Sequence, residues 1–110
     1  MEPVIDSPIN DHHSPVIIKD EAEFNTNHVF EANGQAVTFQ KGPVAECGVN
    51  GLHNEHVVAM VIKRLQDFQN SPYACEENQE ALEHFEKGLD ALLRRTSKRK
   101  ARGVEGTHAI

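Results

Sequence analysis

The stretch "RLQDFQNSPYACEENQEALEHFEKGLDALLRRT", residues 64–96, contains the end of one helical pattern and most of a second. Before the break, apolar side chains recur three and four positions apart, which predicts a helix over about residues 54–69 with Asn54 as its cap. Ser71 and Pro72 predict that the next helix starts at about residue 72, because Ser is a favoured N-cap and Pro fits the first helical position. The stretch therefore predicts an antiparallel α-helical hairpin over about residues 54–101.

The second predicted helix has a seam of the kind that packs against another helix. Its members alternate three and four residues apart: Cys75, Asn78, Leu82, Phe85, Leu89, Leu92, Thr96 and Arg99. Asn78 fits a residue that only sets helix register, as a single buried Asn does. Arg99 is harder to explain by packing, since a guanidinium on a seam needs an anionic partner or several hydrogen-bond acceptors.

The two predicted helices differ in length. At the rise of an α-helix they would be about 24 Å and about 45 Å long, which leaves about 20 Å of the second helix uncovered at its basic end. The seam continues there through Leu89, Leu92 and Leu93. The predicted sheet or a second copy of the chain would cover these leucines, and we expect a homodimer built on the long helices.

The N-terminal part of the chain predicts strands. Residues 28–42, "HVFEANGQAVTFQKG", predict a β-hairpin, because Asn33-Gly34 is a favoured pair for a two-residue turn with positive φ. Residues 15–19, "PVIIK", suit an additional edge strand. We therefore expect an α+β fold, with an N-terminal antiparallel β-hairpin or small sheet followed by a long antiparallel α-helical hairpin, assembled as a homodimer or higher oligomer. Its expected parts are an acidic flexible arm (1–25), the β-hairpin and a loop (26–53), and the α-helical hairpin with a basic C-terminal tail (54–110).

Positive charge is concentrated in one short segment of an acidic chain. The formal net charge is −6, yet residues 94–102 contain six of the eleven Lys and Arg residues. Duplex nucleic acid is one candidate partner for such a cluster, but the acidic remainder of the chain would repel an extended polyanion. A small phosphorylated ligand held in a pocket avoids that repulsion, and Arg95, Arg99 and Arg102 offer planar donor forks suited to phosphate. Lys98 and Lys100 fit the solvated, dipole-matched end of a helix.

The sequence gives little support for catalysis, metal binding or disulfides. The His-His-Ser at 12–14 is a lone fragment of a phosphodiesterase motif, so we expect no catalytic residue and no enzyme activity. Cys47, His53 and His56 are too few to predict zinc, and we expect no cofactor. Cys47 and Cys75 are expected to be reduced thiols of a cytosolic protein, buried as small apolar residues. No segment approaches the roughly 18 apolar residues of a membrane span, and no signal peptide opens the chain, so no membrane partner is expected.

Three segments are similar to a known family. "FQKGPVAECGVNG" (39–51), residues 64–96 quoted above, and "RKARGVEGTH" (99–108) resemble the Acb/Tad hairpin-domain proteins of phages, in particular the anti-Thoeris signal-sequestering proteins called sponges. The similarity covers about residues 39–108. It implies a protein that binds cyclic ADP-ribose variants made by bacterial Thoeris enzymes, without cleaving them, in the cytoplasm of the infected bacterial host. Some family members also bind cyclic di- or trinucleotide signals of the CBASS defence at separate sites in hexamers, and the resemblance leaves open whether this chain does.

The resemblance also implies which residues bind the ligand. In the family an aromatic residue late in the first helix stacks on the base, an Asn early in the second helix donates hydrogen bonds, and two Arg one turn apart bind the diphosphate. The matching residues here are Phe68, Asn78, Arg95 and Arg99. We expect supporting contacts from a second set of residues near the C-terminus, which are Arg94, Thr96, Arg102, Thr107 and His108.

Helix geometry constrains this expected site. Asn78 and Arg95 would lie about 25 Å apart along one helix, too far for one nucleotide-sized ligand to touch both. If two long helices pair antiparallel, the Phe68 end of one chain meets the Arg99 end of the other, and each dimer has two shared pockets. Two alternatives use residues 94–102 differently, either as a nucleic-acid-binding segment or as part of a structural assembly module.

Overall fold

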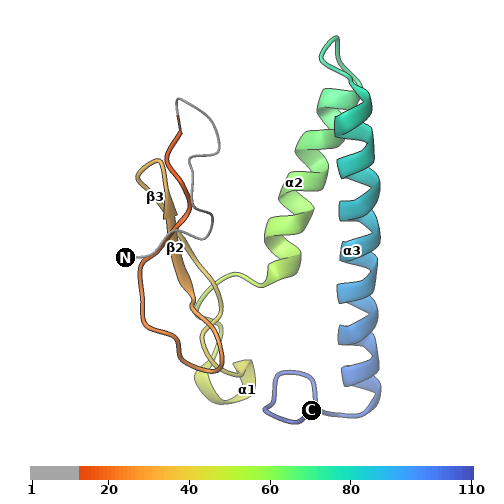
Figure 1. Ribbon diagram of the computed structural model, residues 1–110. Coiled ribbons are helices and arrows are strands. Elements are labelled where there is room, and N and C mark those ends of the chain that lie inside the picture. Colours follow the sequence, from red (N-terminus) through yellow and green to blue (C-terminus); the bar gives the residue numbers. More distant parts are fainter. Residues whose placement is uncertain (1–12) are drawn as a thin grey trace. The chain divides into compact units, whose positions relative to one another are not determined.

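The computed structural model describes residues 13–110 and has an α+β fold (Figure 1). A three-stranded antiparallel sheet in the order β1-β2-β3 is followed by helices, which confirms the predicted fold class. Contacts divide the chain into two units, Met1–Leu52 and His53–Ile110, and each unit is described by itself. The first part of the predicted acidic arm, residues 1–12, lies outside the described residues.

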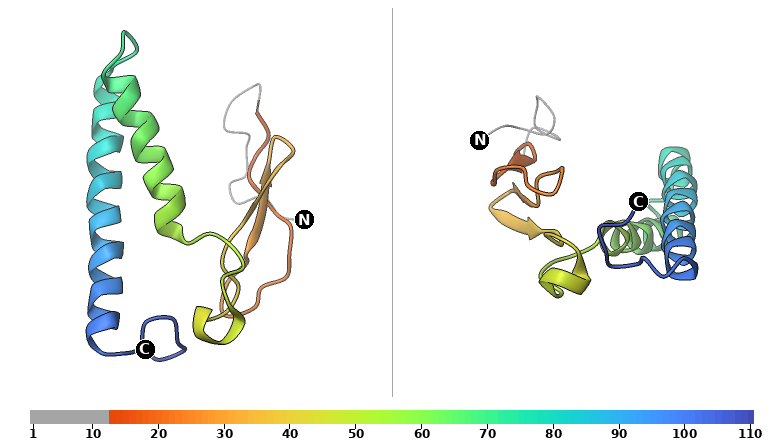
Figure 2. Two further views of the ribbon diagram at one scale, coloured as in Figure 1. Left: turned by 180° about the vertical axis from the view of Figure 1, so that it is seen from behind. Right: turned by 90° about the horizontal axis from the view of Figure 1, so that it is seen from below.

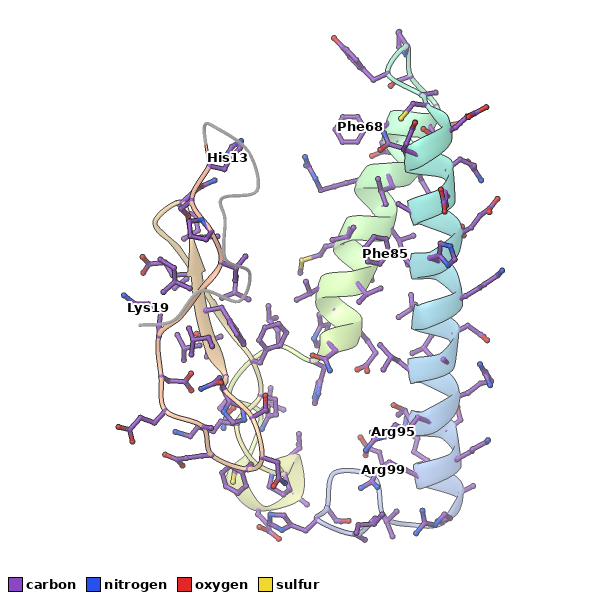
Figure 3. The ribbon with its side chains drawn as sticks, in the orientation of Figure 1. His13, Lys19, Phe68, Phe85, Arg95 and Arg99 are labelled. Atoms are coloured by element: carbon purple, nitrogen blue, oxygen red, sulfur yellow. The ribbon has the colours of Figure 1, made fainter. Side chains whose placement is uncertain are left out.

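The sheet is built on the predicted hairpin. Strand β2 (Val29–Ala32) pairs antiparallel with β3 (Gln35–Thr38), and Asn33 and Gly34 make the turn with φ of 51° and 76°. Positive φ at both turn positions is what the Asn-Gly pair predicts. Strand β1 (Ile17–Ile18) pairs with β2 on the other side, so an edge strand lies inside the segment that was expected to be an arm. Next to β1, Lys19 Nζ lies 3.8 Å from Glu31 Oε2. Lys19 is labelled in Figure 3.

The segment after β3 forms a loop that ends beside the end of that strand. Phe39 forms a parallel bridge with Leu52, and Gly51 lies so close that a Cβ atom there would be 2.5 Å from the Phe39 carbonyl. A short helix, α1 (Val44–Cys47), lies within the predicted loop. Asn50 closes this loop, because its side chain accepts the Lys41 N–H at 2.7 Å and donates to the Lys41 carbonyl at 2.8 Å.

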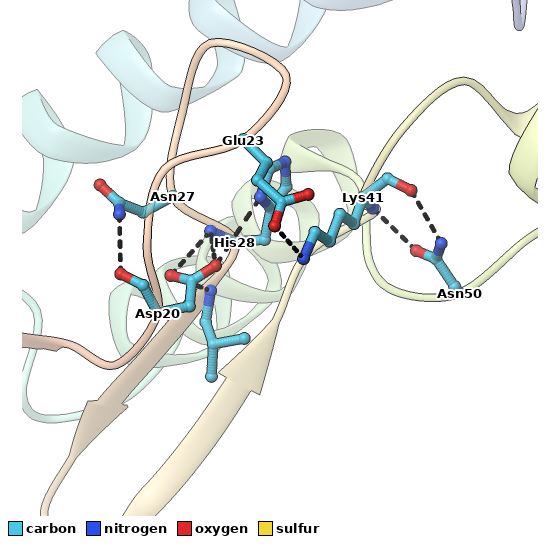
Figure 4. Close-up of polar contacts among 7 residues, drawn as sticks. Asp20, Glu23, Asn27, His28, Lys41 and Asn50 are labelled. Carbon is cyan, nitrogen blue, oxygen red and sulfur yellow. Dashed lines mark hydrogen bonds and ion pairs between the residues drawn. The ribbon is translucent and has the colours of Figure 1, made fainter.

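A polar network ties the loop between β1 and β2 (Figure 4). The Asp20 carboxylate accepts the backbone N–H groups of His28 at 3.0 Å and Val29 at 3.2 Å, and Asn27 donates to the Asp20 carbonyl. Desolvation raises the pKa of Asp20, but the two N–H donors, followed by the nearby His28 and Lys41, outweigh it and hold that pKa below its ordinary value. The ionised carboxylate is therefore the form that the folded loop favours.

The second unit is the predicted helical hairpin. Helix α2 (Asn54–Gln69) and helix α3 (Glu76–Ala101) run antiparallel, lie closest near the turn and diverge away from it (Figure 2). The predicted bounds of α2 and the end of α3 are confirmed. The cap of α2 is a correction, since His53 and not Asn54 is the N-cap residue. His56 Nδ1 accepts the backbone N–H of His53 at 2.9 Å, so an imidazole satisfies this donor.

The start of α3 also corrects the prediction. The predicted N-cap, Ser71, instead donates its hydroxyl to the Phe68 carbonyl at 2.6 Å, and α3 begins only after Cys75. Gln69 ties the two helices across the turn. Its Oε1 accepts the Cys75 N–H at 3.1 Å and its Nε2 donates to the Cys75 carbonyl at 3.0 Å. A side chain from the preceding helix therefore binds the backbone where a local cap was expected.

The hairpin core is small and lies between the two helices. Ile62 and Leu82 are buried, whereas Phe85 is 40% exposed and Leu93 is 51% exposed. With 16 residues in α2 and 26 in α3, about 15 Å of α3 extends beyond its partner helix. The two thiols, in contrast to the prediction of buried cysteines, are both exposed.

Candidate functional site

The overhanging end of α3 has a pocket on its basic face. Its volume is about 320 Å³, at the lower end of small-molecule sites. Five of its seven lining residues are cationic, and the full lining is Ala91, Arg94, Arg95, Lys98, Arg99, Arg102 and Ile110. The lining residues between Ala91 and Arg102 share one face because they recur three and four positions apart along α3 and its C-cap. The pocket therefore offers a concentrated set of donors to an anionic group.

Arg99 is bound by the tail that follows α3. One Nη donates to the carbonyl of Ala109 at 2.6 Å, and the other donates to the carbonyls of Val104 at 3.0 Å and Thr107 at 3.1 Å. Figure 3 shows Arg99 beside this tail, with Arg95 one turn earlier on the same helix. The several acceptors that a guanidinium on the seam requires are thus backbone carbonyls of the same chain.

Local hydrogen bonds shape the tail. Gly103 follows the C-cap Arg102 with φ of 73°, and its N–H and that of Val104 donate to the carbonyls of Lys100 and Arg99 at 3.0 Å each. This pattern is a Schellman motif. Further along, the Thr107 hydroxyl donates to the Val104 carbonyl, which holds a second turn around Gly106. The predicted supporting residue Thr107 therefore orders the tail.

The other pocket cations differ in what they bind. The side chains of Arg95 and Lys98 have no hydrogen-bond or ion-pair partner within residues 13–110. Arg94 donates to Asp90 at 3.0 Å, and Arg102 donates to the Ile110 carbonyl at 3.0 Å.

Thr96, expected to support ligand binding, donates to the Leu92 carbonyl within its own helix at 3.3 Å. His108, the remaining expected supporting residue, is exposed in the tail.

The two other predicted ligand residues lie at the opposite end of the hairpin. Phe68 is 39% exposed near the turn, and Asn78 is half-buried in the first turns of α3. Figure 3 shows Phe68 at the turn, far along the helices from Arg95 and Arg99. Asn78 and Arg95 are separated by about 25 Å of helix. One chain thus brings together Arg95 and Arg99 but does not bring them to Phe68 or Asn78.

Three features of the site were not predicted from the sequence. The Arg64 guanidinium lies 5.6 Å from the centre of the Phe68 ring, a cation–π distance. The i, i+4 spacing of Arg64 and Phe68 on α2 was a signal for this contact. Lys98, interpreted from the sequence as solvated, lines the pocket. The tail carbonyls that bind Arg99 had no sequence signal, because every residue type has a carbonyl.

Other residues that the sequence singles out lie in the first unit and at the start of α2. His13 Nδ1 lies 2.6 Å from Asn33 Nδ2, which places the described part of the His-His-Ser segment beside the β-hairpin turn. Within residues 13–110, no group of three His, Cys, Asp or Glu side chains is placed to hold a metal ion. Over the same range, no helix combines the length and apolar character that crossing a bilayer requires.

The sequence over residues 31–97 matches the family described as Acb2/Tad1, hairpin domain. Because this match covers more than half of the chain, the protein belongs to that family. The matched range includes Phe68, Asn78 and Arg95, while Arg99 and the tail follow it. The family predicted from the sequence segments is therefore confirmed.

A similar protein is Thoeris anti-defense 1 of Bacillus phage SBSphiJ7. The two chains are 56% identical over 72 residues. The aligned part is 66% of this chain and 51% of the phage protein, so this chain spans about half the length of that relative.

Proposed function

We propose that this chain is a phage anti-defence protein that acts against Thoeris by binding a cyclic ADP-ribose-type signal and sequestering it without cleavage. Membership of the Acb2/Tad1 hairpin-domain family and similarity to a Thoeris anti-defense protein support this proposal. The structural observation on which it most depends is the cationic pocket at the end of α3. Its place of action is the cytoplasm of the infected host, where such a signal would be made.

The proposed chemistry is recognition of a diphosphate and a base. Arg95 and Arg99, one helical turn apart, present guanidinium forks that match the paired oxygens of a diphosphate. Phe68, which is 39% exposed, offers an aromatic ring for base stacking, and Asn78 offers an amide for hydrogen bonds. In this proposal the ligand is held by these four residues and undergoes no bond breaking, so the protein is not an enzyme.

The proposed binding unit is an antiparallel homodimer, because the two halves of the site lie at opposite ends of one chain. Helix α3 has Glu76 and Glu77 in its first turn and Lys98, Arg99 and Lys100 in its last. An antiparallel pair therefore places acidic turns of one copy beside basic turns of the other, which is favourable. The exposed Phe85 and Leu93 would be covered in the same interface.

Sequestration requires tight binding at high protein concentration, since no turnover removes the signal. A nanomolar dissociation constant corresponds to about −12 kcal/mol. A base stack, several charge-assisted hydrogen bonds and burial between two subunits are of the kind that reach this value. Each chain of a dimer would contribute one ligand site.

The experiment that tests the proposal is capture followed by heat release. Purified protein is mixed with the product of an active Thoeris enzyme, free ligand is removed, and the protein is then denatured. Intact cyclic nucleotide in the heated fraction is the expected result. Release of an opened product would mean that the protein is an enzyme. If nothing is captured, repeating the assay with cyclic di- and trinucleotides and with duplex DNA would test the other ligands of the basic segment.

Two single variants and their mixture test the shared pocket. Phe68→Ala and Arg95→Ala should each abolish capture while the oligomer persists, because each removes one half of every pocket. Arg95 suits this test since, among residues 13–110, its side chain donates no hydrogen bond to the tail, unlike Arg99 and Arg102. Lys87→Ala, on the same helix but outside the pocket lining, is the matched control and should bind normally.

A mixed dimer of these variants should regain half of the wild-type binding capacity. One of its two pockets then has both defects and the other has none, provided that Phe68 and Arg95 come from different copies. Ligand bound per dimer, measured by isothermal titration calorimetry, gives the answer. A mixed dimer with no binding would show instead that each pocket is built within one chain.

A further inference from the structure

The contact between Arg99 and the tail resembles anion recognition. Each Nη of Arg99 donates to tail carbonyls, at 2.6 Å to Ala109 and at 3.0 and 3.1 Å to Val104 and Thr107. Ile110 contributes a longer contact at 3.5 Å. The two Nη groups form the fork that an arginine presents to the oxygens of a phosphate. The tail oxygens therefore occupy the acceptor positions around Arg99 that the oxygens of a bound anion would take.

We propose that residues 104–109 are an internal competitor for the Arg99 guanidinium. In the free protein, an entering anion meets Arg95 and Lys98, whose side chains have no hydrogen-bond or ion-pair partner within residues 13–110. It reaches the Nη groups of Arg99 only after the tail carbonyls have left them. The identity of the physiological anion rests on the proposed function, whereas the competition itself concerns any anion of diphosphate size.

The exchange is favourable because of the difference in charge. A hydrogen bond between a guanidinium and an anionic oxygen is stronger than one between a guanidinium and a neutral carbonyl. Thr107, His108 and Ala109 are exposed, so their release uncovers no apolar core. Once released, the tail carbonyls form hydrogen bonds with water instead.

Competition of this kind has a kinetic signature. A site that is open for only a fraction of the time has an apparent affinity equal to its intrinsic affinity multiplied by that fraction. A tail that is closed for about nine-tenths of the time would lower the association rate about tenfold. The dissociation rate of a ligand already bound to Arg99 would be unaffected, because the tail is then displaced.

The variant that separates the tail from the site is Gly106→Val. Gly106 has φ of 77°, which a β-branched residue adopts only with strain, so the substitution disrupts the tail turn without altering any pocket residue. Gly88→Ala is the matched control, since Gly88 lies within α3 with nothing within 4 Å of an added Cβ. It changes a glycine of the same unit and leaves the tail intact.

The first measurement is stopped-flow binding of cyclic ADP-ribose to wild type and both variants. Gly106→Val should associate several-fold faster and dissociate at the wild-type rate, whereas Gly88→Ala should match wild type. An unchanged association rate would overturn the proposal. So would faster dissociation of Gly106→Val, which would mean that the tail covers the ligand and retains it.

The second measurement is independent of the physiological ligand. Inorganic pyrophosphate is added to the wild-type protein while amide hydrogen exchange is followed at Thr107 and Ala109, whose N–H groups are hydrogen-bonded within the tail. Faster exchange at both amides supports the competition even if cyclic ADP-ribose does not bind. Unchanged exchange would overturn it, as would failure of Gly106→Val to bind pyrophosphate, since the variant has an uncovered Arg99.

Discussion

At each end of the helical hairpin, one side chain binds backbone groups of another segment, and the two side chains differ in charge. At the turn, the neutral amide of Gln69 binds both backbone groups of Cys75. At the far end of α3, the cationic Arg99 binds carbonyls of Val104, Thr107 and Ala109. A neutral amide has little to gain from a dissolved anion, whereas a guanidinium has much. The comparison indicates that the contact of Gln69 with Cys75 is permanent, whereas the tail carbonyls bound to Arg99 can be exchanged for an anion.

The burial of apolar side chains also differs between the two ends of the helical hairpin. Leu82, near the turn, is 7% exposed, while Leu93, on the overhanging part of α3, is 51% exposed. Burial of apolar surface within one chain is therefore concentrated toward the turn. The far end has apolar surface that only a neighbouring surface can bury.

The largest expected effect is that of Leu82→Ala. Removing a buried leucine side chain should lower the free energy of unfolding by about 2–4 kcal/mol, because it leaves a cavity between α2 and α3. Leu93→Ala should cost less in dilute protein, and its cost should grow with protein concentration if copies pack on this face. Urea denaturation at two protein concentrations measures both. Equal, concentration-independent losses for the two variants would contradict the difference between the ends.

A smaller effect is expected from Gln69→Ala. The variant loses two hydrogen bonds to Cys75 at the start of α3, and the loss of such a cap costs about 1 kcal/mol. Gln66→Ala, at an exposed position one turn earlier in α2, is the control and should have almost no effect. Thermal unfolding with and without pyrophosphate sharpens the comparison. The contribution of Gln69 should not change with the anion, and a change would mean that the turn end is also exchangeable.

Asp20 makes a third contact of this kind, in which its carboxylate accepts the backbone N–H groups of His28 and Val29. Replacing Asp20 should have the smallest effect on stability of the three changes near neutral pH. Asp20→Asn keeps one accepting oxygen, so the loop between β1 and β2 should remain closed. The effect depends on pH. Because the folded loop lowers the pKa of Asp20, the ionised form adds stability above the unfolded pKa, near 4, and this contribution disappears as pH falls through the lower folded pKa.

Wild type should therefore lose protection of the Val29 amide below about pH 4, while Asp20→Asn should show a weaker pH dependence. Hydrogen exchange at Val29, followed by nuclear magnetic resonance, measures this. Glu21→Gln is the control, since Glu21 is exposed and adjacent in sequence. An identical pH profile for wild type and Asp20→Asn would show that another group controls the loop.

The sequence predicted those elements whose side-chain pattern is itself the cause of the structure. The period of the apolar residues predicted α2, and the positive φ required by Asn33-Gly34 predicted the β-hairpin. The error at the start of α3 arose where side chains bind backbone groups outside a local N-cap motif. Ser71 binds backward to Phe68, and Gln69 reaches forward to Cys75. Local propensity does not include these longer contacts.

The half of the candidate site that contains Arg95 and Arg99 was more predictable from the sequence than its meeting with Phe68 and Asn78. The spacing of Arg95 and Arg99 places them on one face of α3, and the pocket there includes both. The meeting of this face with Phe68 and Asn78 depends on a second copy of the chain and stays a prediction. The tail contact with Arg99 depends on backbone carbonyls, which the identity of the residues does not encode.

The exposure of both cysteines affects how the assembly can be studied. Cys47 lies in the first unit and Cys75 at the turn of the helical hairpin, and both thiols are accessible to reagents. Air oxidation of a purified sample can link two copies through such thiols, and a covalent pair has the mass of a genuine dimer. Sedimentation or light-scattering measurements therefore need a reducing agent. The same two thiols also provide natural attachment points for fluorescent dyes, one in each unit, with no engineered residue.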